Sequence, residues 1–523
     1  MRSVMTHQFS QVPRADIPRS SFDRSHGVKT TFNAGRLIPI FVDEALPGDT
    51  FHLSVTSFGR LATPLHPIMD NLFLDYFFFA VPLRLIWTNF VRFMGEQPNP
   101  GDSTSFLVPQ ITAPVGGFTE GSPYDYMGIP TKIAGIKVNS LHLRAYNLIW
   151  NEWFRDQNLQ NSVPVPKGDG PDTSTDFVIL QRGKRHDYFT SALPWPQKGP
   201  AVSIPLGSTA PVISNNTPIT IAFNDGTGSP IQMHTSGTVN PLLGPTHAGA
   251  GTHPIKFAGT ATGLSTDLST ATAATINQLR QAFQVQKIYE RDARGGTRYT
   301  ELIQSHFGVT SPDARLQRPE YLGGGQANVN VNPIAQTSNT SAAPAPLGTL
   351  GAMGTLAARG VGFSKSFTEH CVLIGMVCAR ADLNYQQGLN RMWSRQSRFD
   401  YYWPALSHIG EQSVLNQEIY ADGSANDALT FGYQERYAEY RYKPSIITGS
   451  FRSNATLTLD TWHLAQSFSS LPALNSSFIV DSPPVARVIA TPADPHFLLD
   501  TFINLRCARP MPLYGVPGNI DRF

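Results

Sequence analysis

The chain has 523 residues, which is long for one compact core, since domains usually contain about 50–250 residues. Its 40 lysines and arginines nearly balance its 38 aspartates and glutamates, so the composition excludes a chain that is basic throughout and predicts that any nucleic-acid contact is local. Charged residues make up only 15% of the chain, which predicts a surface covered by neighbours, and 43 glycines with 41 prolines favour a loop-rich β protein over a disordered one.

Residues 1–36 are predicted to form a basic, polar N-terminal arm, in which Pro13 and Pro18 disfavour a helix. Residues Met1–His7 contain no apolar run, so we expect no signal peptide. The longest apolar stretch, Leu72–Leu83, is too short to span a bilayer. The sequence therefore predicts a protein that is made and kept in a cytoplasm, without membrane insertion.

Strand signals begin at Leu37 and recur along the chain. In residues 51–56, apolar and polar residues alternate with a period of two, which is typical of a half-buried strand. Residues 72–81 are bulky on both faces, as expected of a strand inside a core. Further strands are predicted at residues 372–377, 429–447, 477–480 and 502–506. Pairing between such distant strands predicts a mainly β fold, an antiparallel sandwich or jelly roll with large insertions.

Four stretches are predicted to be insertions or connections. Helical spacing of apolar residues occurs at Leu141–Gln157 and Thr275–Ala293. Residues 201–274 hold only three charged residues and are rich in Gly, Pro, Ser and Thr, which predicts a variable surface protrusion. Residues 323–361, uncharged from Gly323 to Ala358, are predicted to form an extended connection, because long uncharged connections tend to be functional or covered by a partner.

Motifs for catalysis, metal binding or cofactor binding are not found. The sequence has no GxSxG elbow, P-loop, complete GxGxxG or HExxH, and no histidine pair has metal-ligand spacing beside a carboxylate. Cys371, Cys378 and Cys507 form no CxxC pair and are predicted to be buried, reduced thiols. We therefore expect no enzymatic activity, no metal and no cofactor.

Basic and aromatic residues cluster in two segments, 181–189 and 391–399. Such mixtures hold single-stranded nucleic acid, because cations meet phosphates and rings stack on bases. Arginine and aromatic residues are also enriched in subunit interfaces, and this alternative is favoured over DNA for each segment. The candidate DNA-binding residues are Arg182, Lys184, Arg185, Arg391, Arg395 and Arg398.

Several segments, in the same order, resemble the major capsid proteins of microviruses, specifically the gokushovirus branch. The resemblance extends from about residue 20 to the C-terminus and is interrupted by residues 201–274. No single motif is specific for this family, but the number of motifs and their shared order are. The segments are Lys29–Phe32, Val42–Glu44, Leu46–Asp49, Met69–Phe79, Val81–Pro82, Phe93–Glu96, Ile149–Gln157, Asp187–Thr190, Leu193–Gly199, Tyr402–Pro404, Tyr437–Tyr442 and Arg509–Pro512.

The resemblance implies an eight-stranded jelly roll whose sixty copies form a T = 1 icosahedral shell around a circular single-stranded DNA genome. It implies as partners the chain itself, a small basic internal protein, a minor pilot protein and a host receptor. It also implies that the variable insertion forms protrusions at the threefold axes; Phe223 and Phe257 are its candidate host-attachment residues. Within the arm, Arg14, Arg19, Arg24 and Lys29 are candidates for neutralising packaged DNA, or for clamping a neighbouring subunit.

Two other functions compete with a shell subunit. One is a soluble carbohydrate-binding or hydrolytic β-sandwich, whose cleft would use Trp150, Trp153 and Trp195. The other is a nucleic-acid-binding protein that does not assemble. A stable monomer in solution would favour either of these over a shell subunit.

Overall fold

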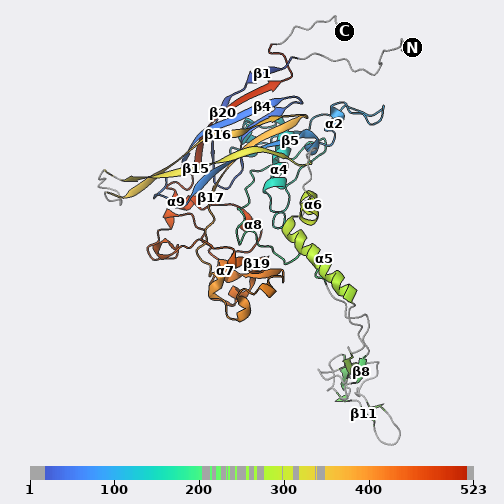
Figure 1. Ribbon diagram of the computed structural model, residues 1–523. Helices are drawn as coiled ribbons and strands as arrows, with labels where there is room; N and C mark the ends of the chain where they lie inside the picture. The colour runs from blue at the N-terminus through green and yellow to red at the C-terminus, as the bar shows by residue number, and fades with distance from the viewer. Residues whose placement is uncertain are drawn as a thin grey trace, which may run out of the picture. The chain divides into compact units, whose positions relative to one another are not determined.

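The structure is a computed structural model that describes residues 18–202, 276–296, 298–309, 317–335, 337 and 348–514, with short segments at 212–214, 220–224, 231–232, 234–235, 242–243, 255–257 and 264–267 (Figure 1). Arg14 lies outside the described residues. The chain divides into two compact units, Met1–Pro196 with Thr310–Phe523, and Gln197–Val309.

The first unit is built on one antiparallel sheet that curls into two facing halves. Sheet 1 has the order β2–β20–β4–β16, with β1 preceding β2 on the same side of β20. Its strands are β1 (Ser20–Asp23), β2 (His26–Phe32), β20 (Phe497–Arg509), β4 (Thr50–Leu61) and β16 (Leu350–Ser366).

Sheet 2 has the order β3–β17–β5–β15. Its strands are β3 (Ile38–Ala45), β17 (Cys371–Ala381), β5 (Leu72–Pro82) and β15 (Glu320–Ala335). β15 pairs with β5 through its first half and with β16 through its second half, so the β15–β16 hairpin joins the two sheets. With β1 and β2 counted as one interrupted strand, four strands face four in a jelly roll, and the predicted fold is confirmed.

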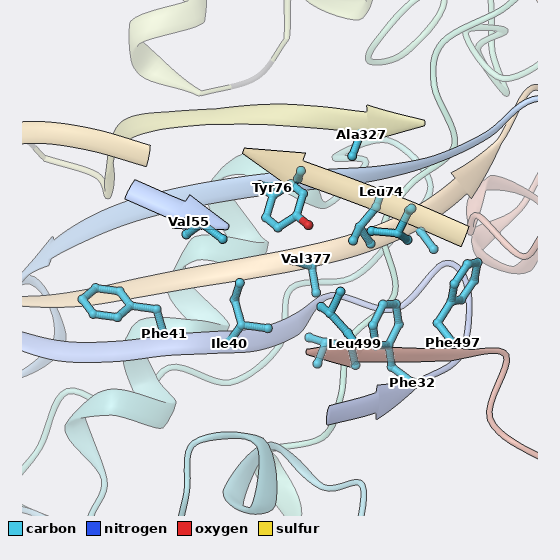
Figure 2. Packing of buried hydrophobic residues seen from close by; sticks show 14 of the residues in the cluster. Phe32, Ile40, Phe41, Val55, Leu74, Tyr76, Ala327, Val377, Phe497 and Leu499 are labelled. Atoms are coloured by element: carbon cyan, nitrogen blue, oxygen red, sulfur yellow. The ribbon is translucent and has the colours of Figure 1, made fainter. Parts of the chain in front are cut away.

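The main core lies between the two sheets. Alternate residues of β4 and β20 are buried, as the period of two predicts, and meet side chains from β3, β5 and β17. Figure 2 shows this layer, where Phe32, Val55 and Phe497 of sheet 1 approach Ile40, Leu74 and Val377 of sheet 2. Each fully buried side chain of this kind stabilises the fold by about 1.5–3 kcal/mol.

Within sheet 2, β5 and β17 are buried on their other face as well. Phe79, Val372 and Ile374 point into a second core, which contains Trp87 and side chains of α4 (Leu141–Ile149). The predicted helix at residues 141–157 is confirmed, although α4 is shorter and passes into a π-helical turn at Trp150–Phe154. Cys371, Cys378 and Cys507 are free and buried, as predicted.

Further short elements of the first unit lie in the connections between the jelly-roll strands. They are α1 (Leu83–Ile86), α2 (Phe90–Phe93), β6 (Gln110–Thr112), α3 (Pro123–Tyr126), β7 (Lys137–Asn139), β18 (Glu411–Leu415), α7 (Asn416–Ile419), β19 (Thr430–Glu435), α8 (Ser476–Ile479) and α9 (Val485–Val488), with single 3-10 turns between them.

Several sequence predictions need correction. Part of the segment predicted as an arm is instead strand: Ser20–Asp23 and His26–Phe32 form the first, interrupted strand of the jelly roll. Residues 323–361 are not a connection: they form most of β15 and β16, where glycine-rich, weakly apolar strands gave no clear alternation. Residues 477–480 lie mostly in α8, because Asn475 caps a helical turn there. Only residues 430–435 of the strand predicted at 429–447 are extended and paired.

The second unit contains small antiparallel pairings and two helices. β9 (Thr220–Phe223) pairs with β10 (Ile231–Gln232) and β13 (Ile255–Phe257), while β11 (His234–Thr235) pairs with β12 (Leu242–Leu243) and β8 (Val212–Ser214) with β14 (Leu264–Thr266). The predicted helix at 275–293 is confirmed as α5 (Ile276–Gly295), followed by α6 (Tyr299–Phe307). Most of the predicted 201–274 protrusion lies outside the described residues.

Candidate functional site

Residues 391–403 present a group of aromatic rings to solvent. The segment folds into 3-10 turns at Arg391–Trp393 and Arg398–Asp400, and a third at Pro404–Leu406 follows it. Such turns keep the backbone compact without burying the side chains they carry. The rings are each about half exposed, at 48–54%, and together form what we call the aromatic patch, namely Phe399, Tyr401, Tyr402, Trp403 and Tyr440.

Contacts within the chain fix these rings in place. The guanidinium carbon of Arg395 lies 4.3 Å from the ring centroid of Tyr440 and 5.4 Å from that of Tyr401. The indole N–H of Trp403 donates to the backbone oxygen of Arg398 at 2.8 Å. The patch is thus a pre-organised surface, which lowers the entropy lost when a partner covers it.

Beneath the patch, arginines are neutralised by carboxylates of the same chain. Arg391 donates to Glu418 at 3.0 Å, and Arg395 lies 3.7 Å from Glu439. Burial raises the pKa of Glu418, and Arg391 opposes that effect. Arg398 differs: it is exposed, its guanidinium lies 4.6 Å from the Phe399 ring centroid, and it makes no ion pair within the described part of the chain. Because Arg391 and Arg395 already have carboxylate partners, a second protein can cover the exposed rings without leaving either of these arginines buried as an unpaired charge.

The second basic segment, residues 181–189, lies largely inside the first unit. Arg182 and Arg380 both bind the carboxylate of Asp75, which is 5% exposed. Lys184 is buried, with its ammonium 4.2 Å from the ring centroid of Phe478, and burial lowers its pKa to about 8. Of the three predicted cations here, only Arg185 is exposed to solvent.

The candidate arm residues bind neighbouring strands. Arg24 makes a two-pronged contact with Asp43, at 2.5 and 2.9 Å. Lys29 pairs with Asp500 across β2 and β20 at 3.1 Å, and Arg19 donates to the hydroxyl of Thr50 at 2.5 Å. Each of these cations therefore already has an intramolecular partner.

The two candidate attachment residues differ in exposure. Phe223 on β9 is 6% exposed, whereas Phe257 on the neighbouring strand β13 is 54% exposed. Sequence reasoning missed Glu418 and Glu439 as the carboxylates that neutralise the 391–395 arginines, because the sequence does not show which distant acidic residue meets which arginine. Tyr440 lay in a quoted segment of the resemblance, but only the fold shows that it joins the patch.

Neither a metal cluster nor a membrane-spanning helix is found in the described ranges. No three His, Cys, Asp or Glu side chains are placed to hold a metal ion there. None of the helices described is long and apolar enough to cross a bilayer.

A jelly roll of two facing four-stranded layers is the fold of viral capsid domains, among other proteins. The comparisons assign the chain to that class: it belongs to the family "Capsid protein (F protein)", whose model matches residues 10–519.

Its relatives include capsid protein VP1 of Bdellovibrio phage phiMH2K, 49% identical over 99% of this chain and 98% of the relative. Capsid proteins VP1 of Chlamydia phage 1 and Spiroplasma virus 4 are 45% and 38% identical, each over 99% of this chain and 98% of the relative. The resemblance to gokushovirus capsid proteins is therefore confirmed, and the chain is a phage capsid protein.

Proposed function

We propose that this chain is the major shell subunit, sixty copies of which close into a T = 1 icosahedral particle around a circular single-stranded DNA genome. The observation that carries the proposal is the aromatic patch. Its half-exposed rings are held rigidly, and Arg391 and Arg395 beneath them are neutralised inside the subunit. A surface of this composition gains most by excluding water against a second copy of the chain.

The remaining partners belong to the same proposal. A small basic internal protein and a minor pilot protein join the particle, which assembles in the host cytoplasm, and the subunit catalyses no reaction. Residues 201–274 form threefold protrusions that contact the host receptor; the exposed ring of Phe257 suits this role better than the buried ring of Phe223. Of the predicted DNA contacts, Arg19, Lys29, Arg185 and Arg398 are exposed, and the role of all of them stays a prediction.

Assembly of the purified chain tests this proposal. Expressed alone and with the internal protein, it should form closed shells by negative-stain microscopy and elute as particles in size-exclusion chromatography. Replacing Tyr402 and Phe399 by serine should release soluble, folded subunits that do not close. The matched control, Tyr514→Ser, removes a ring that is 80% exposed and lies outside the patch. A stable monomer under all conditions would contradict a shell function.

A further inference from the structure

The outer face of sheet 1 is left uncovered by the rest of the first unit. Along β4 and β20 every second residue points away from the core, and from Thr56 to Arg60 and from Leu498 to Arg506 these outward residues are exposed. Figure 1 shows α4 on the side of β5 and β17, away from β20 and β4, in agreement with its packing. In sheet 2, β5 and β17 are buried on both faces, whereas the outward residues of β4 and β20 in sheet 1 are open to a partner.

This face carries exposed apolar rings, which sheets facing plain solvent usually lack. Phe58 on β4 is 48% exposed and Phe502 on β20 is 53% exposed. In the register, Phe58 lies opposite Asp500 and Phe502 opposite Thr56, so the two rings are diagonal neighbours on one face. Diagonal pairs are about 7–8 Å apart, within reach of one ligand that spans both rings.

Cations surround the two rings. Arg60 lies two residues beyond Phe58 on the same strand, with its guanidinium 5.7 Å from that ring centroid. Arg359 on β16 lies opposite Thr56, which is itself opposite Phe502. Both arginines are exposed, and neither forms an ion pair with any residue the structure describes.

The other charges of the face largely cancel. Lys29 pairs with Asp500, and Arg506 lies opposite Asp23 on β1. Arg60 and Arg359 are therefore the positive charges left in excess beside the rings. On the β2 side, Phe58 and Arg60 also line a cleft of about 890 Å³, which Glu120 and Asp125 line as well. Glu120 is paired with Lys132, so Asp125 is the carboxylate that repels an anion there, and an anionic chain would run from Arg60 towards β16 and Arg359.

We propose that the outer face of sheet 1 binds single-stranded DNA, with bases stacked on Phe58 and Phe502 and phosphates held by Arg60 and Arg359. Aromatic rings on an open sheet, flanked by cations, bind single strands of any sequence, because every base has a π face. The proposal rests on the proposed function, since the genome is the partner it names. It identifies the genome-facing side of the subunit by residues that no motif singled out.

Oligonucleotide binding by the soluble full-length subunit tests the proposal independently of shell closure. The probe is fluorescein-labelled (dT)20, titrated by anisotropy at several salt concentrations. Replacing Arg60 and Arg359 by glutamine removes two phosphate contacts, so the slope of log K against log[salt] should become shallower by about 1.4, at ~0.7 per contact for single strands. Each single substitution should give half of that change.

Removing the rings should weaken affinity without changing the salt slope. Phe58→Ala and Phe502→Ala should each lower affinity roughly 5- to 150-fold, the range found when one base loses its aromatic partner. Because both rings are about half exposed, these variants should fold. Two matched controls, Phe257→Ala for an exposed ring and Arg441→Gln for an exposed arginine, should leave binding unchanged.

A second measurement needs no variant. Ultraviolet cross-linking of DNA-filled particles, followed by mass spectrometry, should attach nucleotides to peptides that contain Phe58 or Phe502. Unchanged oligonucleotide binding by both sets of variants, or cross-links confined to other surfaces such as that around Arg398, would overturn the proposal. Variants that fold and bind DNA normally but cannot close shells would show instead that the face is a subunit contact. If the native chain binds (dT)20 as described but never assembles, only the shell function fails.

Discussion

Arg391 donates from Nη1 to Oε1 of Glu418 at 3.0 Å, and the same nitrogen donates to the backbone oxygen of Ser413 at 2.6 Å. The carboxylate also accepts from the hydroxyl of Tyr188 and from the backbone N–H of Leu415, each at 2.9 Å. Arg391, a candidate for DNA contact in a segment for which the sequence favours an interface, thus connects the base of the aromatic patch to the buried interior of the first unit.

Removing this guanidinium should be costly. In Arg391→Gln, the Glu418 side chain, 4% exposed, loses its charged partner. Breaking a buried pair from one side costs about 3–5 kcal/mol, because the remaining charge stays desolvated. Urea unfolding followed by tryptophan fluorescence measures the loss. Arg398→Gln, the exposed control, should stay within about 0.5 kcal/mol of the native chain; equal stabilities for the two variants would show that the pair is unimportant.

Two adjacent phenylalanine rings on β5 should contribute equally to the stability of the fold, each in a different core. Phe78 is 0% exposed and packs between the sheets, while Phe79 is 1% exposed and packs in the second core with α4. Each substitution by alanine should cost about 3–5 kcal/mol. Because the rings lie in separate cores, the double variant should show a nearly additive loss. Thermal unfolding measures both, and soluble, assembly-competent variants at both positions would contradict the assignment.

Strands with bulky or alternating side chains are predictable from the sequence, because burial of one or both faces of a strand produces a recognisable pattern of apolar residues. Phe51, Leu53 and Val55 alternate, and the residues around Phe78 and Phe79 are apolar on both faces; all lie in the expected kind of strand. β15 and β16 escaped prediction because glycine replaces side chains where they would clash: a Cβ on Gly324 would lie 2.2 Å from the backbone oxygen of Tyr76. The pairing of these strands depends on close approach between backbones, and the glycines that permit it leave no hydrophobic pattern in the sequence.

The candidate site was less predictable for an electrostatic reason. Sequence shows where cations occur, but not whether a carboxylate distant in sequence neutralises them. Asp75 binds Arg182, and Asp43 binds Arg24, across 107 and 19 residues of chain. Conversely, Arg60 stood alone in sequence, and only the register of sheet 1 places it in a group with Arg359 and two rings.

Asp481 should make stability depend on pH. It is 4% exposed, one of its oxygens has no hydrogen-bond partner among the described residues, and burial raises its pKa to about 6. Between pH ~4 and ~6 the folded state binds more protons than the unfolded state, so stability falls as pH rises through this window. Above this pH window the carboxylate is charged in both states, and the folded state keeps the full free-energy cost of burying that charge.

Asp481→Asn should therefore be more stable than the native chain at pH 7, by on the order of 2–3 kcal/mol, with the difference vanishing near pH 4. Urea unfolding at pH 4, 5, 6 and 7 gives the comparison. The control Asp500→Asn changes an exposed carboxylate and should show no such convergence. A difference that stays constant over the whole pH range would rule out the titration of Asp481 as its cause.

Replacing residues 205–270 by a short Gly-Ser linker should separate shell formation from attachment. Gln197–Val309 form a compact unit of their own, so the jelly roll of the first unit keeps its strands, and closing the shorter connection costs little, since each doubling of loop length adds only ~0.6 kcal/mol. Such particles should close and hold DNA but fail to adsorb to host cells, measured by counting unbound particles. A milder variant, Phe257→Ser, removes one exposed ring and should weaken adsorption without altering particle yield. Normal infection by the linker variant would refute the attachment role, whereas failure to form particles would show that the segment clamps subunits together.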